Sequence, residues 1–250
     1  MTNSEKSPRI GMLSTAKDPG LVQEVLTSME LVSPEIYEVV VIPTAGNENG
    51  RENNKFADTA ISAMRSAGFG DIKELDISDV KKTAAGDFDV VQDALTSPLA
   101  DGRDRILLIT GGNIHFLRHH LEESGADSLI RQEVESGRLA LVTVSAGSIN
   151  MGTTLALTGS ENKIGLLHTN GVGLVNFGVV CHFSSDKEEQ LMQKIAVVSL
   201  EIPRIVTITD EQALVGDCRK FSVVGKGSVT VFERNPEDSA YSRRVSRNIA

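Results

Sequence analysis

A serine directly follows a mostly apolar run near the middle of the chain. Leu139 to Val144 is typical of a buried strand, and the next three residues are Ser145, Ala146 and Gly147. The small residues after the serine let a helix begin at once, which holds the hydroxyl at a sharp corner above the sheet. A serine in this place is a candidate nucleophile, and the N–H of Ala146 is a candidate oxyanion donor.

This corner matches only part of the G-x-S-x-G pattern of serine hydrolases. Gly147 occupies the last position of the pattern, whereas Thr143 stands where the first glycine would be. In the alternative interpretation, Ser145 caps the N-terminus of a helix that follows a strand. The local motif leaves both interpretations open.

A second turn, made of Gly111, Gly112 and Asn113, follows the apolar run 105–109. Glycines let the backbone approach a ligand closely, so these three residues are candidates for an oxyanion and substrate-binding wall, with the N–H of Gly112 as a second donor. The alternative is an ordinary turn that binds phosphate at the start of the next helix. The turn is not G-x-G-x-x-G and no Walker A lysine follows it, so nucleotide binding is not expected.

A serine nucleophile needs a base, and histidine is the usual choice because its pKa lies near neutrality. His182 ends the apolar run 178–183 and is therefore the best-placed candidate. His115 and His119 have the i,i+4 spacing of a metal pair, but no carboxylate or cysteine pattern completes a site, so no metal is expected. We expect His115, His119 and His120 at the surface or the cleft edge, and His168 has no distinguishing context.

Apolar runs alternate with segments of helical spacing along the first 150 residues. The expected strands are 9–15, 37–43, 72–77, 105–109 and 139–144, and the expected helices are 21–31, 56–67, 87–95, 114–123, 128–135 and one from 148. Short strands at 205–209, 213–215, 221–224 and 228–232 predict an antiparallel extension of the sheet edge. The pattern predicts an α/β fold, a mostly parallel sheet with helices on both faces and antiparallel C-terminal strands. We expect one domain at 9–235, between a disordered tail at 1–8 and a polar tail at 236–250.

Composition excludes several classes of protein. A net charge of −9 disfavours a nucleic-acid partner, which requires clustered lysine and arginine. No window has the apolar length of a membrane span, and the N-terminus lacks the apolar core of an export signal. Cys181 and Cys218 form no CxxC pair and are expected to be reduced thiols. These features predict a cytoplasmic protein that contacts neither nucleic acid nor membrane and needs no cofactor.

In the order and spacing of these motifs the chain resembles the peptidase E family of serine peptidases, the alpha-aspartyl dipeptidases, to which cyanophycinase is related. The resemblance runs from about residue 9 to about residue 233, and it rests on Gly111-Gly-Asn113, Ser145-Ala-Gly147, Gly173-Leu-Val-Asn-Phe177, His182-Phe183 and Thr209-Asp-Glu-Gln-Ala213. It implies a fold similar to class I glutamine amidotransferases and peptide hydrolysis through an acyl-enzyme. By position, Ser145 would be the nucleophile, His182 the base, and Gly112 and Ala146 the oxyanion donors.

The resemblance leaves the acidic partner of the histidine open. The family places an aspartate about fifteen residues after the serine, where this chain has Ser160 followed by Glu161. We take Glu161 as the first candidate and Asp210 as the second. Two further departures are Thr143, which replaces a small residue, and Cys181, which replaces the usual proline before the histidine.

The expected function is therefore a serine-type exopeptidase or dipeptidase acting on a small peptide, with a possible aspartyl preference. Such a preference requires a cationic pocket, for which Arg51, Arg118 and Arg131 are candidates by position. Two alternatives stay open: a cyanophycinase-like isopeptide hydrolase with a wider cleft, and an inactive relative that binds a small molecule. A homodimer is also open.

Overall fold

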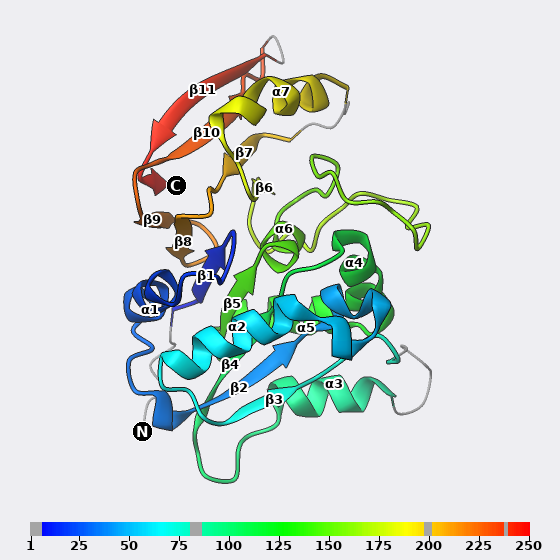
Figure 1. Cartoon of the computed structure of the whole chain (residues 1–250), viewed down its shortest axis with the longest axis vertical. Coiled ribbons are helices and arrows are strands. Elements are labelled where there is room, and N and C mark those ends of the chain that lie inside the picture. The colour runs from blue at the N-terminus through cyan, green and yellow to red at the C-terminus, as the bar shows by residue number, and fades with distance from the viewer. Residues whose placement is uncertain (1–6, 81–86, 198–201, 238–239) are drawn as a thin grey trace.

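The computed structural model describes residues 7–80, 87–197, 202–237 and 240–250. Its strands form two sheets, one of eight strands in the order β12-β9-β8-β1-β5-β4-β2-β3 and one of four in the order β11-β10-β7-β6 (Figure 1). The strands are β1 (Arg9–Leu13), β2 (Tyr37–Ile42), β3 (Ile72–Glu74), β4 (Asp104–Ile109), β5 (Leu139–Val144), β6 (Gly178–Val180), β7 (Arg204–Thr207), β8 (Gln212–Gly216), β9 (Phe221–Gly225), β10 (Val229–Arg234), β11 (Tyr241–Ser246) and β12 (Asn248–Ile249). The α-helices are α1 (Pro19–Ser28), α2 (Lys55–Ser66), α3 (Asp87–Thr96), α4 (Ile114–Glu123), α5 (Ala126–Glu135), α6 (Ala146–Met151) and α7 (Glu188–Val197).

The centre of the large sheet is parallel and buried on both faces. β1, β5, β4, β2 and β3 pair in parallel in that order. Successive residues of β2 face opposite ways: Val39 and Val41 pack in the core under α1 and α2, whereas Val40 and Ile42 pack in the core under α3, α4 and α5. Burial on both faces explains why the central strands β2 and β5 are largely apolar, and it confirms the predicted α/β class.

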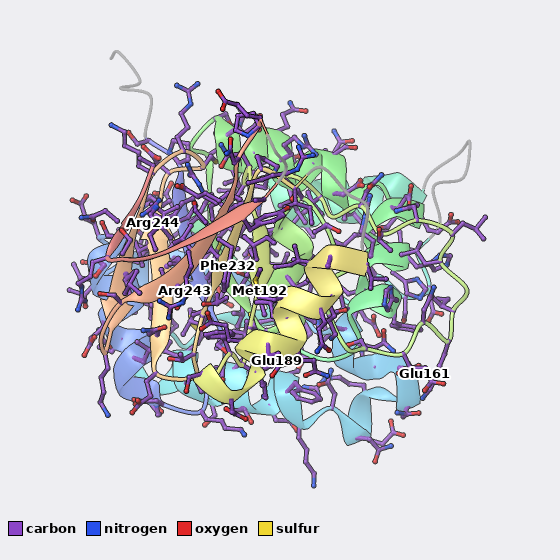
Figure 2. All side chains as sticks on the ribbon, turned by 90° about the horizontal axis from the view of Figure 1, so that it is seen from above. Glu161, Glu189, Met192, Phe232, Arg243 and Arg244 are labelled. Atoms are coloured by element: carbon purple, nitrogen blue, oxygen red, sulfur yellow. The ribbon has the colours of Figure 1, made fainter. Side chains whose placement is uncertain are left out.

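The C-terminal strands divide between the two sheets. β8 and β9 extend the large sheet with antiparallel pairing, as expected, and β12, which was not expected, pairs with β9. The expectation that all the short strands extend this edge is wrong, because β7, β10 and β11 join β6 in the second sheet. Helix α7, which the sequence analysis did not predict, covers this sheet by packing Leu191 and Ile195 against Phe232 (Figure 2 shows α7 with Met192 beside Phe232).

The structure corrects the expectation of a polar tail at 236–250. Residues 241–246 form β11 along the edge of the second sheet, and 248–249 form β12 at the edge of the large one (Figure 1). Half of the residues of β11 are exposed and none is buried, so the segment is polar although its backbone is paired. The disordered tail expected at 1–8 falls mainly on residues 1–6, outside the described residues. None of the helices in the described ranges is long and apolar enough to cross a bilayer.

Candidate active site

Ser145 occupies the corner between β5 and α6. Its backbone has φ 50° and ψ −108°, a conformation that costs energy for any residue other than glycine. The side chain makes no capping hydrogen bond to α6, so the interpretation as a helix cap is wrong. The N–H of Ser145 donates to the carbonyl of Leu13 at 2.9 Å, which ties the corner to the neighbouring strand β1.

The residues around this corner accommodate Thr143, which stands where the G-x-S-x-G pattern has its first glycine. Thr143 is fully buried, and its Oγ1 lies 2.9 Å from the hydroxyl of Ser148 and 3.3 Å from the carbonyl of Gly11. Gly147 has to be glycine, since a Cβ there would lie 2.5 Å from the carbonyl oxygen of Ile109. Thr143 therefore fills a hydrogen-bonded place in the core beneath the serine.

His182 follows β6 in the second sheet and approaches the serine from that side. Its Nε2 lies 2.9 Å from the Oγ of Ser145. The φ of His182 is 56°, so Ser145 and His182 are two of the four non-glycine residues with positive φ in the described chain. Backbone strain at two residues whose side chains are hydrogen-bonded to each other is typical of a functional site.

Asp210 stands in the turn before β8 and contacts the other side of the imidazole ring. Its Oδ1 lies 2.6 Å from Nδ1 of His182. Because the carboxylate accepts the Nδ1 proton, Nε2 is left as an acceptor that faces the hydroxyl of Ser145. Burial alone would raise the pKa of Asp210, but hydrogen bonds from Ser14 and His182 and the charge of Lys17 lower this pKa below its usual value.

Glu161, the first candidate for the acid, is not brought to His182. Its side chain is exposed, and its carboxylate lies 3.8 Å from Nζ of Lys163. Figure 2 places Glu161 on a loop at the periphery of the molecule. The structure thus favours the second candidate, Asp210, and the preference for Glu161 is corrected. The family spacing pointed to residue 161. Spacing along a loop does not determine where the side chains of that loop point, so this prediction failed.

The glycine turn lies against the serine. A Cβ on Gly111 would lie 3.2 Å from Cβ of Ser145. Gly112 has φ 142°, and a Cβ there would lie 2.1 Å from the carbonyl oxygen of Ala45, so only glycine fits. Ala146 is the first residue of α6, where a backbone N–H has no acceptor within the helix. Gly112 and Ala146 thus both lie where the oxyanion wall was expected.

Asn113 has a different part in this turn. Its Oδ1 accepts from the N–H groups of His115 and Phe116, both at 3.0 Å, and so caps α4. Its Nδ2 donates to Glu48 and to the carbonyl of Glu161, both at 3.2 Å, and its backbone N–H donates to Ala45. These bonds favour a structural role for Asn113 in place of the expected contact with substrate.

A cavity of about 490 Å³ opens above Ser145 and His182. Its lining is mostly apolar, with one wall from α7 and its preceding turn. The lining residues are Phe56, Gly112, Ile114, Ser145, Ile149, Leu157, Thr158, Gly159, Ser160, Val180, Cys181, His182, Phe183, Lys187, Gln190, Leu191 and Lys194. The volume falls in the range of small-molecule sites and suits a short peptide.

The cations of this cavity are not the predicted arginines. Among the described residues, the lining includes two lysines and no arginine. Nζ of Lys187 donates to the carbonyl of His182 at 3.1 Å, and Nζ of Lys194 donates to the carbonyl of Thr158 at 3.3 Å. These lysines were missed because α7 was missed.

The three arginines are engaged elsewhere. Arg51 pairs with Glu74 and Asp58, Arg118 with Asp127, and Arg131 donates to a backbone carbonyl of the loop before β6.

The remaining histidines form no metal site. The described residues contain no group of three His, Cys, Asp or Glu side chains that could hold a metal ion. His115 is buried and so does not lie at the surface, which was one of the two places expected for it, and burial lowers its pKa. His120 packs edge-on against Phe116, and His168 pairs with Glu122 at 2.9 Å.

Ser14 was also missed by the sequence analysis. It is fully buried, and its Oγ donates to Oδ1 of Asp210 at 2.7 Å. The same signal that pointed to Ser145, a serine directly after an apolar strand, is present at Ser14 after β1.

Comparison with known proteins defines the family of this chain. The model of peptidase family S51 matches residues 13–224, and the chain belongs to that family. An uncharacterized peptidase of Listeria monocytogenes serovar 1/2a, Lmo0363, is 26% identical over 116 residues, which are 45% of this chain and 56% of the relative. Lin0382 of Listeria innocua serovar 6a, likewise an uncharacterized peptidase, is 25% identical over 116 residues, 45% of this chain and 55% of the relative. The match thus spans little more than half the length of these curated relatives.

Solved structures share the fold at low sequence identity. A candidate peptidase E protein from Listeria monocytogenes EGD-e superposes with a TM-score of 0.63 at 19% identity, covering 88% of this chain and 100% of that one. A peptidase from an acI-B1 Actinobacterium superposes with a TM-score of 0.62 at 16% identity, covering 98% of both chains. The fold is therefore that of these peptidases.

Proposed function

We propose that this protein is a serine-type peptidase that cleaves short peptides through an acyl-enzyme on Ser145. One observation carries the proposal: an unbroken hydrogen-bonded chain runs from Oγ of Ser145 through both nitrogens of His182 to Asp210, with contacts of 2.9 and 2.6 Å. This is the arrangement in which a neutral imidazole accepts the proton of a hydroxyl while a carboxylate stabilises the resulting imidazolium.

The proposed reaction has two halves. Oγ of Ser145 attacks the scissile carbonyl carbon as its proton passes to Nε2 of His182. The oxyanion that forms accepts hydrogen bonds from the N–H groups of Gly112 and Ala146. His182 then gives the proton to the leaving amine as the C–N bond breaks. In the second half, His182 takes a proton from the water that attacks the acyl ester and returns it to Oγ of Ser145 as the C–O bond breaks and the carboxylic acid product leaves.

The cavity supports a dipeptide or short peptide as substrate. Its volume is about 490 Å³, and Lys187 and Lys194 both line it. Two ammonium groups in the wall of this cavity favour a substrate that carries a negative charge, such as an aspartyl side chain or a terminal carboxylate. We therefore propose an aspartyl or other acidic preference for this peptidase.

Labelling with a fluorophosphonate tests the proposal. Wild type, Ser145→Ala and His182→Ala are each treated with the probe and measured by intact mass, beside an active serine hydrolase as control. We expect one adduct on wild type and none on either variant. Ser124→Ala, which removes a fully buried hydroxyl at the end of α4, should label like wild type. Absence of an adduct on wild type, while the control hydrolase labels, would reject an activated Ser145.

A further inference from the structure

Ser14 contacts two members of the proposed triad with one hydroxyl. It is the first residue after β1 and is fully buried. Its Oγ lies 2.7 Å from Oδ1 of Asp210, 2.8 Å from the backbone nitrogen of His182 and 3.3 Å from Nδ1 of the same residue. No step of the reaction described above uses this residue.

The donors and acceptors of these contacts can be assigned. A serine hydroxyl has one proton to donate and two lone pairs. A carboxylate only accepts, so the hydroxyl proton of Ser14 goes to Asp210, and a lone pair accepts the backbone N–H of His182. The Nδ1 proton of His182 is directed at Asp210, which is closer at 2.6 Å. Oδ1 of Asp210 therefore accepts from Ser14 and from His182 together.

These two bonds act where the site needs support. The positive φ of His182 is an unfavourable conformation for a histidine, and the bond from its N–H to Ser14 helps to hold it. Asp210 is about half exposed, with a side-chain exposure of 52%, so without a second donor its carboxylate is free to turn toward water. Ser14 supplies that donor from a fully buried position.

The strand that carries Ser14 also holds the nucleophile. The carbonyl of Leu13 accepts the N–H of Ser145 at 2.9 Å and the hydroxyl of Ser148 at 2.8 Å. Two consecutive residues at the end of β1 thus fix the serine corner on one side and the histidine and aspartate on the other. β1 lies between β5, which precedes Ser145, and β8, which follows Asp210.

We propose that Ser14 is a positioning residue that holds His182 and Asp210 in register with Ser145, an inference that rests on the proposed peptidase function. Its hydroxyl does not react. It fixes the backbone of the base and the carboxylate of the acid, so that Nε2 of His182 stays within hydrogen-bonding distance of Ser145.

The test compares Ser14→Ala with Ser14→Thr and with Ser124→Ala. Ser124 is matched to Ser14 because it is also a fully buried serine, and its Oγ donates to the carbonyl of His120 at 2.6 Å, outside the proposed site. Melting temperatures measure the structural cost of each change. We expect Ser14→Ala to react with the fluorophosphonate about 10- to 100-fold more slowly than wild type, the range for losing a hydrogen bond to a charged group. Ser14→Thr, which keeps the hydroxyl, should recover most of the rate, and Ser124→Ala should react like wild type.

A second measurement does not depend on labelling. Long-range ¹⁵N–¹H spectra report which ring nitrogen of a neutral histidine carries the proton. We expect His182 of wild type to be the Nδ1–H tautomer, and its ring in Ser14→Ala to be a mixture of tautomers. If wild type labels, but Ser14→Ala labels at the wild-type rate and keeps the single tautomer, Ser14 has no positioning role. If wild type does not label while the tautomer still changes in Ser14→Ala, the peptidase proposal fails and the positioning role stands. If wild type does not label and the tautomer of His182 is unchanged in Ser14→Ala, both the peptidase proposal and the positioning role are rejected.

Discussion

Nε2 of His182 lies 2.9 Å from Oγ of Ser145 although the strands that precede the two residues belong to different sheets. Ser145 follows β5 of the large sheet, and His182 follows β6 of the second. The contact between the two side chains therefore depends on how the second sheet is attached to the first. The end of β1 is hydrogen-bonded to the backbone N–H of Ser145 and to that of His182. A change that distorts either sheet should therefore lower the proposed peptidase activity before the chain unfolds.

Exchange of the carboxylate for an amide separates the two acid candidates. In Asp210→Asn the amide cannot stabilise a positive imidazole ring, and it favours the wrong tautomer when it donates to Nδ1. We expect kcat for a cleaved peptide to fall by about 10³- to 10⁴-fold, as in serine hydrolases that lose this carboxylate. Glu161→Gln should keep kcat within about twofold, because its side chain lies beside Lys163. A larger loss in Glu161→Gln than in Asp210→Asn would restore Glu161 as the acid.

Local signals in the sequence predicted the parallel half of the fold and two members of the site. Leu139 to Val144 is buried on both faces, so it is apolar except for Thr143, and the small residues after it mark the Ser145 corner. β11 and Asp210, the proposed acid, lacked such signals. β11 is an exposed edge strand whose backbone pairing leaves no hydrophobic pattern, and Asp210 reaches His182 only through the pairing of β8 with β1. Long-range pairing of this kind is not encoded in the spacing of residues.

Glycine at position 112 should be required for the proposed oxyanion wall. In Gly112→Ala the new Cβ would lie 2.1 Å from the carbonyl oxygen of Ala45 at a φ of 142°, so the turn must move. We expect kcat to fall by at least about 10²-fold, the usual loss when one oxyanion donor is displaced. Gly102→Ala is the control: its φ is 74°, but a Cβ there meets nothing within 4 Å, so it should cost about 1 kcal/mol of stability and no activity. Equal kcat in Gly112→Ala and wild type would remove Gly112 from the wall.

Glu38 should contribute stability that depends on pH. Its side chain is 2% exposed, and its carboxylate accepts from Arg105 at 2.8 Å and from Lys73. Burial alone would raise its pKa, but the hydrogen bonds from Lys73 and Arg105 lower it below the ordinary 4.5. A lowered pKa means that the carboxylate stabilises the fold above about pH 4.5 and that this contribution is lost as the pH falls through the folded-state pKa.

Urea unfolding of Glu38→Gln measures this contribution. At pH 7 we expect the variant to be less stable by about 3 kcal/mol, because Arg105, whose side chain is 11% exposed, loses its ionic partner and keeps its bond to the carbonyl of Ser97. The difference from wild type should shrink as the pH falls below about 4.5. Lys73→Gln should cost less than about 1 kcal/mol, since the side chain of Lys73 is 63% exposed. A pH-independent difference for Glu38→Gln would mean that packing, and not charge, accounts for it.

Lys194 should favour acidic substrates through its charge. Its ammonium group is held on the cavity wall by the carbonyl of Thr158, which leaves two of its protons for a substrate carboxylate. We expect Lys194→Gln to lower kcat/KM for an aspartyl dipeptide about 10-fold and to leave the asparaginyl analogue within about twofold, because only the first substrate carries the charge. Lys163→Gln is the matched control, since Lys163 is 56% exposed beside Glu161 and does not line the cavity. Added salt should reduce the difference between the two substrates in wild type and leave it nearly constant in Lys194→Gln. Equal losses for both substrates would mean that Lys194 shapes the cavity without reading charge, and the acidic preference would then rest on Lys187 alone.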